Sequence, residues 1–195
     1  MRRRWLRTGA VLIGMGLSAC GRPSGPVVIP SDEIPFPVAR TSAPSPSPSP
    51  EETITVFFAR AGRLVPTGRV VGSDQQAAEA AARALLEGPT GAERVDGVDT
   101  AVPLQTGLLE VQVLEQVADI DLSAEFQSPA EPEVIHLRIA QVVWTLVDLA
   151  DVNAVRFFID GSPIQVVTDK GVPVDRPVTA RDFASVAPFL QSPGP

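Results

Sequence analysis

The sequence predicts a single small α+β domain of about six strands and two helices, in the order ββα-ββα-ββ, with the helices packed on a mixed or antiparallel sheet. Two observations predict this fold class. Short β-branched and aromatic runs occur in pairs that are separated by turn residues, which is typical of hairpins. Two longer stretches repeat their apolar residues with the period of a helix, and one of them follows each of the first two hairpins.

The first hairpin is expected at the start of the domain. Ile54–Ala59 and Leu64–Val71 are rich in β-branched and aromatic residues, and Ala61–Arg63 between them suits a tight turn. Pro66 interrupts the second run, and proline cannot donate to a sheet ladder. We therefore expect this run at a sheet edge or at a bulge.

The first helix is expected to begin at Ser73. Ser73 and Gln76 have the spacing of a capping box, in which the serine caps the helix and the glutamine reaches back. Ala77–Leu86 consists largely of strong helix formers. Gly88-Pro89 is expected to end the helix, because glycine suits a left-handed cap and proline cannot continue the helix.

The second half repeats this order after a loop over residues 90–106. Leu108–Leu114 and Val117–Leu122 alternate apolar and polar residues, which predicts two strands. The break at Glu115-Gln116 between them predicts a tight hairpin.

A second helix and two further strands complete the predicted domain. The helix is expected over Glu133–Ala150 and is apolar around most of its circumference, so it must be covered on most sides. The strands are expected over Ala154–Asp160 and Ile164–Thr168, with Asp160–Pro163 turning between them.

The N-terminal segment has the form of a secretory signal. Met1–Arg7 carries four arginines, and Thr8–Leu17 is an apolar run about half as long as the ~20 residues that a membrane-spanning helix requires. Leu17-Ser18-Ala19-Cys20 resembles the lipobox of bacterial lipoproteins. The resemblance implies cleavage between Ala19 and Cys20, a covalent diacylglyceryl lipid on Cys20, and a protein that is lipid-anchored to the membrane on its extracytoplasmic side.

The chain is therefore expected to have four parts. A signal peptide occupies residues 1–19, a lipidated tether rich in proline and serine occupies 20–52, the domain occupies 53–170, and a partly disordered tail occupies 171–195. The tether has too few apolar residues to bury a core, so we expect it to stay unfolded and extended.

Composition argues against several functional classes. The formal net charge is −7, and it becomes −11 without residues 1–19, because these hold four of the 16 basic side chains and none of the 23 acidic ones. Such an acidic chain lacks the clustered basic residues that nucleic acid requires. One cysteine and one histidine argue against a structural zinc site, and no cofactor or metal is expected besides the lipid on Cys20.

The second helix offers the main candidate binding site. With about 100° between successive residues, Arg138, Gln141, Thr145 and Asp148 lie on one polar stripe. Such a stripe is either an edge that faces water or a loop, or a binding site for a ligand.

The sequence predicts that the protein is not an enzyme. His136 could act as a general base, but the sequence shows no nucleophile elbow, second histidine or cysteine partner for it. The acid pairs Asp119/Asp121 and Asp96/Asp99 could belong to a glycan hydrolase. However, the first pair alternates with apolar residues in a strand, and the second lies in a loop that contains glycine.

Five stretches between residues 54 and 168 have the residues, order and spacing of a known family. They are Ile54–Phe58 with Leu64–Pro66, Ala84–Thr90, Gly97–Pro103, Ala118–Ser123, and Ala140–Leu146 with Val155–Gly161. In these stretches the domain resembles the GerMN domain of sporulation and germination lipoproteins and of other bacterial envelope lipoproteins. The resemblance implies a non-enzymatic binding or scaffolding module for which no catalytic residues are defined.

The leading hypothesis is an envelope lipoprotein that contacts membrane lipid through Cys20 and binds a protein or peptidoglycan partner. A role in sporulation or germination is what the family resemblance implies. The alternative is a lipoprotein that binds a small molecule, which predicts a deep apolar pocket with a few polar groups, lined by the stripe from Arg138 to Asp148. A cell-wall hydrolase is the second alternative, and it predicts a concave cluster of acids with raised pKa values.

Overall fold

The computed structural model describes residues 51–72 and 76–188. The strands are β1 (Glu51–Arg60), β2 (Arg63–Gly72), β3 (Leu108–Leu114), β4 (Val117–Leu122), β5 (Ala154–Ile159), β6 (Ser162–Pro163), β7 (Val166–Val167) and β8 (Pro173–Val174). The α-helices are α1 (Ala77–Glu87), α2 (Gly91–Val95) and α3 (Pro132–Val147), and the 3₁₀ helices are η2 (Ala124–Gln127) and η3 (Ala180–Val186).

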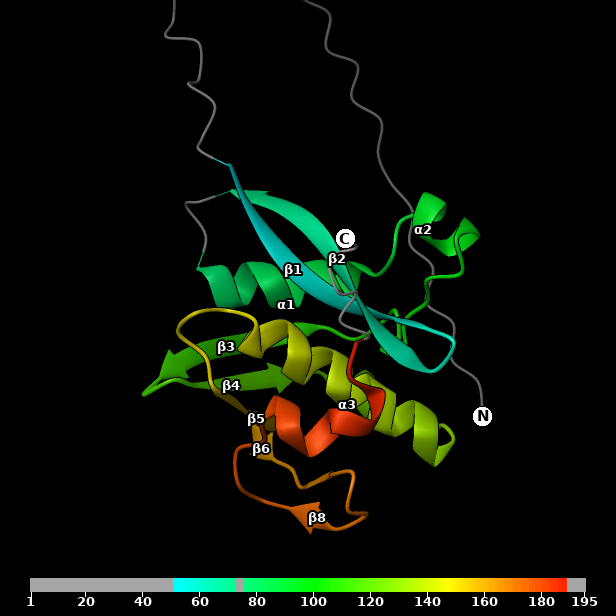
Figure 1. Ribbon diagram of the computed structural model, residues 1–195. Coiled ribbons are helices and arrows are strands. Elements are labelled where there is room, and N and C mark those ends of the chain that lie inside the picture. Colours follow the sequence, from blue (N-terminus) through cyan, green and yellow to red (C-terminus); the bar gives the residue numbers. More distant parts are fainter. Residues whose placement is uncertain (1–50, 73–75, 189–195) are drawn as a thin grey trace, which may run out of the picture. The chain divides into compact units, whose positions relative to one another are not determined.

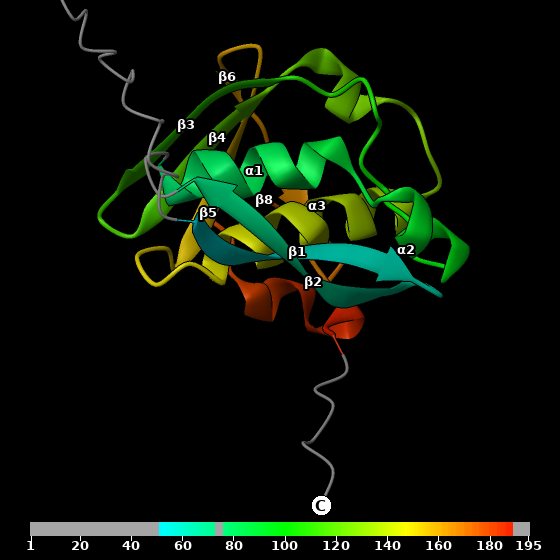
Figure 2. The same ribbon diagram turned by 90° about the horizontal axis from the view of Figure 1, so that it is seen from above.

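Three layers make up the domain (Figure 1). The antiparallel ribbon β1–β2 is the first layer, α1 and α3 form the middle one, and the sheet β3-β4-β5-β6 is the third (Figure 2). The α+β class and the order of the main elements are confirmed. The first five predicted strands are divided between these two sheets, which lie on opposite sides of the helices, while β7 pairs with β8 in a third, small sheet.

The β1–β2 ribbon agrees closely with the predicted hairpin. Its turn residues Ala61 and Gly62 both have positive φ, which matches the right-handed twist of two paired strands. Pro66 lies opposite Phe57 in the register. Each strand of a two-stranded ribbon is an edge, so the expected edge position of Pro66 is confirmed.

The start of α1 differs from the prediction. The helix begins at Ala77, and Gln76 is its N-cap residue without a side-chain cap hydrogen bond. The predicted capping box, in which Gln76 reaches back from inside the helix, is therefore wrong, and Ser73 lies outside the described residues. The predicted end is confirmed: Gly88 has φ +78°, and its N–H donates to the carbonyl of Leu85 at 3.1 Å.

A short helix interrupts the segment that was expected to be a loop. Thr90 and Glu93 form a reciprocal capping box at the start of α2. The Glu93 N–H donates to Oγ1 of Thr90 at 3.3 Å, and the Thr90 N–H donates to Oε2 of Glu93 at 2.7 Å. A helix of five residues is too short for its apolar period to be visible in the sequence.

The third layer contains the most accurately predicted strands. β3 and β4 have the predicted bounds and pair antiparallel around Glu115 and Gln116, which both have positive φ. β4 and β5 pair in parallel, with α3 as the connection between them. Of the strand expected over Ile164–Thr168, only β7 is a strand, and it pairs with β8. The end of the expected turn forms β6, which pairs with β5.

The middle layer is packed closely on both sheets. Five of the six alanines of α1 are buried, and their small side chains let this helix lie close to its neighbours. The middle and C-terminal parts of α3 bury Ile139, Val142, Val143 and Leu146. This agrees with the expectation that the helix is covered on most sides.

The folded unit continues beyond residue 170, where the tail was expected to begin. Val178 exchanges backbone hydrogen bonds with Val155 of β5 at 2.8 Å in both directions. Phe183 in η3 is fully buried against α3. These two apolar residues are too far apart to produce a helical or strand period, so the sequence pattern gave no sign of an ordered segment.

The described residues contain no helix with the length and apolar character of a membrane span. The predicted signal peptide and almost all of the predicted tether lie outside them.

Candidate functional site

A pocket of about 600 Å³ lies beside the first turns of α3. Its walls come from α3, the turn between β7 and β8, the end of η3 and the tip of the β1–β2 hairpin. The apolar part of the lining includes Pro132, Val134, Leu137, Val167 and Val186. The polar side chains of the lining are Glu133 and Thr168 and a group of three: His136, Asp169 and Ser185.

These three side chains contact one another. Nε2 of His136 lies 2.8 Å from Oδ1 of Asp169, and the histidine ring packs on Phe183 with 5.1 Å between the ring centroids. The hydroxyl of Ser185 donates to Oδ1 of Asp169 at 2.5 Å, and its backbone N–H donates to Oδ2 at 2.8 Å. The cluster therefore joins α3 to the β7–β8 turn and to η3.

The charge of Asp169 fixes the orientation of the histidine proton. Burial alone would raise the pKa of the Asp169 carboxyl, but hydrogen bonds from Ser185 and His136 outweigh burial and hold that pKa below its usual value. An ionised carboxylate can only accept, so Nε2 of His136 is the nitrogen that carries a proton. Nδ1 of His136 has no hydrogen-bond partner within the described ranges. In the neutral ring it is a free acceptor.

This arrangement differs from a Ser-His-Asp catalytic triad. In a triad, the carboxylate and the serine hydroxyl contact different nitrogens of the histidine. Here both contact Nε2, and Oγ of Ser185 lies 3.4 Å away from it. The serine hydroxyl donates to Asp169, so the histidine does not accept the serine proton as it would in a triad. The geometry suits the binding of a ligand group that donates a hydrogen bond to Nδ1.

Three of the four residues on the predicted stripe are buried and bind the protein's own backbone. The guanidinium of Arg138 donates to the carbonyl oxygens of Ala101, Phe126 and Ser128 at 3.0, 2.5 and 2.9 Å. Burial lowers the pKa of Arg138. Asp148 is exposed at the C-terminal end of α3.

Gln141 and Thr145 occupy the free edge of β1. Nε2 of Gln141 donates to the carbonyl of Phe57 at 3.1 Å, and Oγ1 of Thr145 accepts from the Phe57 N–H at 3.0 Å. Oε1 of Gln141 also accepts from the Ala101 N–H at 2.7 Å. The stripe therefore joins β1 and the segment around Ala101 to α3, and only Arg138 reaches a small pocket of about 200 Å³.

The acidic pairs have local partners. Asp119 lies 3.5 Å from the guanidinium of Arg156, and Asp121 accepts from the Gly161 N–H at 3.0 Å, both on the outer face of the sheet. Asp96 is the C-cap residue of α2, and the Asp99 carboxylate accepts from the N–H of the next residue at 2.8 Å. Nothing in these contacts favours the hydrolase alternative.

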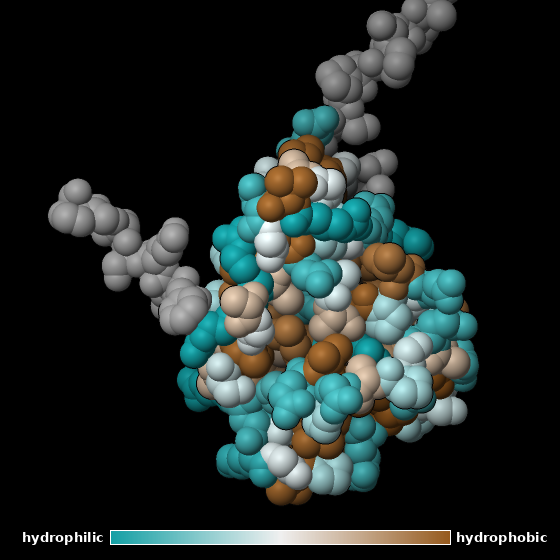
Figure 3. Space-filling model, turned by 90° about the vertical axis from the view of Figure 1, so that its right-hand side faces the viewer, coloured by the Kyte–Doolittle hydropathy of each residue, from teal (hydrophilic) through white to brown (hydrophobic). Residues whose placement is uncertain are grey.

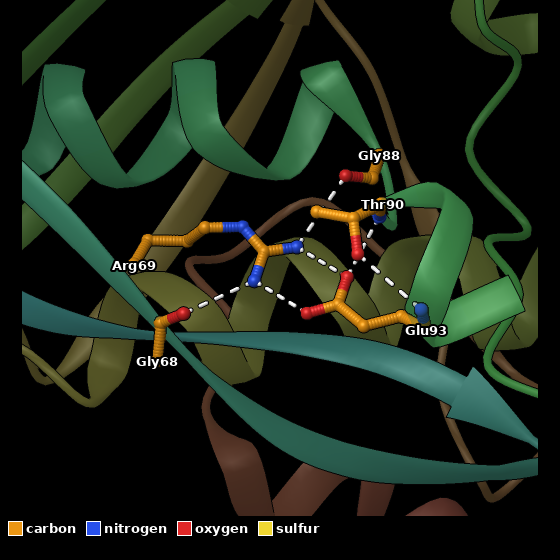
Figure 4. A network of polar contacts seen from close by, with 5 residues as sticks. All are labelled: Gly68, Arg69, Gly88, Thr90 and Glu93. Atoms are coloured by element: carbon orange, nitrogen blue, oxygen red, sulfur yellow. Dashed lines mark hydrogen bonds and ion pairs between the residues drawn. The ribbon is translucent and has the colours of Figure 1, made fainter. Parts of the chain in front are cut away.

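A second polar cluster fastens β2 to α2 (Figure 4). The guanidinium of Arg69 makes two hydrogen bonds to the Glu93 carboxylate, at 2.8 and 2.7 Å, and lies 5.0 Å from the centre of the Phe58 ring. The bonds from Arg69, helped by those from Thr90, lower the pKa of Glu93 to about 2. All of these groups bind one another, so the cluster is structural.

The described residues contain no group of three or more histidine, cysteine, aspartate or glutamate side chains placed to hold a metal ion. Ala19 and Cys20, the predicted cleavage and lipidation residues, lie outside the described part of the chain.

Comparison with protein families identifies the domain. Residues 49–165 match the family Germane, which is described as "Sporulation and spore germination", and this match covers more than half of the chain. The chain belongs to the Germane family. Among curated proteins, none is significantly similar to it in sequence.

Solved structures confirm the fold of the Germane domain. The tandem GerMN domains of the sporulation protein GerM from Bacillus subtilis superpose with a TM-score of 0.55 and 17% identity, over 68% of this chain and 48% of that one. This chain thus spans about half the length of the tandem structure. The first GerMN domain of the same protein gives a TM-score of 0.50 and 16% identity, over 67% of this chain and 98% of that one.

The sequence pattern points to one of the three residues that contact one another in the pocket of the Germane domain. His136 was singled out, but without a partner. Asp169 and Ser185 lie 33 and 49 residues further along the chain, in a turn and in a 3₁₀ helix that carry no periodic pattern. No local signal links them to the histidine.

Proposed function

We propose that this protein is a lipoprotein, anchored through a lipid on Cys20 outside the cytoplasm, whose Germane domain binds an envelope protein without catalysing a reaction. Exposed apolar residues around the pocket carry the binding part of the proposal. Val134, Val167 and Val172 are 39%, 46% and 56% exposed, and the first two line the pocket while Val172 follows the lining residue Gly171. Grouped apolar side chains on a soluble surface mark interaction sites.

The side of the domain at which α3 begins has a surface of both hydrophobic and polar residues (Figure 3). Hydrophobic residues, in brown, are exposed there among polar ones. A second hollow of about 330 Å³ shares Gly62, Val134 and Leu137 with the pocket, so the two adjoin along α3. A surface of apolar side chains beside two adjoining hollows suits a protein better than the polar sugars of peptidoglycan.

The anchor is tested by replacing the cysteine. The Cys20→Ser variant is expected to lose its lipid and to leave the membrane fraction in a high-salt wash, because one thiol carries both acyl chains. Ser24→Ala, a change in the tether, is the matched control and is expected to stay in that fraction. Retention of the Cys20→Ser variant would contradict the anchor.

The binding surface is tested by photocrosslinking in intact cells. A photoreactive amino acid at Val134 or Val167 is expected to capture the same envelope protein. The same group at Val95 is the control, because this residue is 87% exposed but lies on α2, away from the pocket lining. Equal capture from all three positions, or from none, would count against this surface.

A small-molecule lipoprotein is the second candidate, and the pocket itself favours it. Its apolar walls and the open Nδ1 of His136 form an apolar site with a few polar groups. Native mass spectrometry of the protein released gently from membranes is expected to show a bound mass that is lost in the His136→Phe variant. A single unliganded mass for the unchanged protein would remove this candidate.

A further inference from the structure

The outer edge of β3 is an unpaired strand edge. In the sheet order β3-β4-β5-β6, β3 is terminal, and within the described ranges it pairs with β4 alone. Figure 2 shows β3 along the outside of the domain. Such an edge offers a row of free N–H and C=O groups to another strand.

Hairpin geometry identifies the free backbone groups. The two-residue turn after Leu114 makes Leu114 and Val117 a hydrogen-bonded pair, so Gln112 also points its backbone groups toward β4. The carbonyl of Leu122 accepts a hydrogen bond from the residue that follows β5 and so points away from β3. The backbone groups of β4 therefore point alternately to β3 and to β5, as this geometry requires. The N–H and C=O groups of Val111 and Val113 therefore face outward, and no described residue bonds to them.

β3 carries few of the features that protect natural edges. It has no lysine and no proline, and its only charged residue is Glu110. A register shift between Leu108 and Glu110 marks a bulge, so the regular part of the edge runs from Glu110 to Leu114. Five residues are enough to pair with a short added strand.

The outer face of the sheet beside this edge is acidic. Glu110, Asp119 and Asp121 line a hollow of about 220 Å³, and Arg156 forms an ion pair with Asp119. Oδ1 of Asp119 is buried and has no hydrogen-bond partner among the residues described. A basic side chain that reached this face from an added strand would find carboxylates to bind.

We propose that the β3 edge binds an extended segment of a partner protein as a fifth strand of this sheet, and that this segment alternates basic with apolar residues. Val111 and Val113 supply the backbone bonds, and the basic side chains lie over Glu110 on the acidic face. Main-chain pairing gives the affinity, and alternate side chains give the specificity. None of these residues lines the pocket beside α3, so the proposal does not depend on the function proposed above.

The test uses two capped heptapeptides, in which valine alternates with arginine in one and with glutamate in the other. The full chain, labelled with ¹⁵N and held in phosphatidylcholine nanodiscs, is titrated with each peptide, and empty nanodiscs report peptide binding to lipid. Backbone amide exchange is measured residue by residue. In the free protein, the amides of Val111 and Val113 are expected to exchange faster than those of Gln112 and Leu114.

The arginine peptide is expected to slow exchange at Val111 and Val113 by about tenfold or more at saturation. Its binding is expected to weaken with salt, because part of the attraction is between exposed charges. The glutamate peptide is expected to leave both amides unchanged. Equal protection by both peptides, or by neither at about 1 mM, would overturn the proposal.

Two pairs of variants locate the binding site. Val113→Pro removes an outward N–H and is expected to abolish binding, while Val113→Ala keeps that N–H and is expected to retain binding. Glu110→Arg leaves the backbone intact and is expected to reverse the preference between the peptides, while Glu52→Arg on β1 is the control and is expected to keep it. An unchanged preference in Glu110→Arg contradicts the proposed placement, even if the proline variant fails to fold.

A second copy of this chain is the competing occupant. In that case the Val111 and Val113 amides would already be protected from exchange without peptide. Their protection would increase with the protein concentration, and sedimentation of the same samples would show self-association. That result would overturn the proposal of a basic partner segment.

Discussion

Thr145 of α3 completes the hydrogen bonding of Phe57 in β1, 88 residues earlier in the chain. Its Oγ1 accepts from the Phe57 N–H at 3.0 Å, and Gln141, one turn before, donates to the Phe57 carbonyl at 3.1 Å. These are the bonds that a third strand would give to β1. Because β1 is buried at this point, the helix side chains replace that strand and exclude a competing one.

The first prediction concerns this contact. Thr145→Val keeps the shape of the side chain but leaves the buried Phe57 N–H without an acceptor, so it is expected to lower the free energy of unfolding by about 1–3 kcal/mol. Thr145→Ser keeps the hydroxyl and is expected to cost less. Urea unfolding measures both. Equal losses would show that methyl packing, and not the hydrogen bond, determines the effect.

The second prediction concerns the ion pair between Arg69 and Glu93. Glu93→Gln is expected to cost about 2 kcal/mol of unfolding free energy at neutral pH. The matched change Glu79→Gln breaks an exposed pair with Arg83 and is expected to cost less than about 0.5 kcal/mol.

The pH dependence of the Glu93 contribution has a definite sign. Folding lowers the pKa of Glu93 from 4.5 to about 2, so its contribution is complete above pH 4.5 and is lost as the pH falls toward 2. The difference in unfolding free energy between the unchanged protein and Glu93→Gln is therefore expected to shrink over that range. A difference that stays constant would show that the charge of Glu93 contributes nothing.

The third prediction concerns Asp169. Asp169→Asn weakens the bonds to His136 and Ser185, so the amide of Ser185 is expected to exchange about tenfold faster while the β4 amides keep their protection. Asp175→Asn, an exposed change nearby in the sequence, is the control. The pKa of Asp169 is lowered in the folded protein, so its stabilising effect should be present above pH 3.8 and decline below it.

The fourth prediction concerns the C-terminal segment. Phe183→Ala removes a fully buried ring and is expected to cost about 3–5 kcal/mol. Val186→Ala, in the same helix but only half-buried, is expected to cost clearly less. Thermal unfolding measures both. A loss below about 1 kcal/mol for Phe183→Ala would show that this segment is not part of the cooperative unit.

Local patterns were sufficient for most of the fold. The bounds of β3 and β4 follow from alternation around Glu115-Gln116, and the end of α1 follows from Gly88. The missed elements, α2, η2, β6, β8 and η3, are too short to show a period. The predicted start of α1 is wrong because a serine followed three residues later by a glutamine also occurs where no capping box forms.

The candidate site was much less accessible from the sequence. The polar stripe of α3 was visible at helical spacing, but helical spacing cannot tell whether water, a ligand or another strand covers a polar side chain. The structure places Arg138, Gln141 and Thr145 against the backbone. The structure also brings the polar partners of His136 together in the pocket. No periodic pattern in the sequence connects these partners to the histidine.

The sequence by itself determined the family resemblance, the layout of hairpins and helices, and the predicted lipid anchor at Cys20, because turns, periods and cleavage motifs are encoded by residues close together in the chain. Only the tertiary structure decided which polar groups are consumed inside the molecule and which remain available, such as Nδ1 of His136 and the outward groups of Val111 and Val113. A hydrogen bond forms between groups that packing brings within about 3 Å, whatever their separation along the chain.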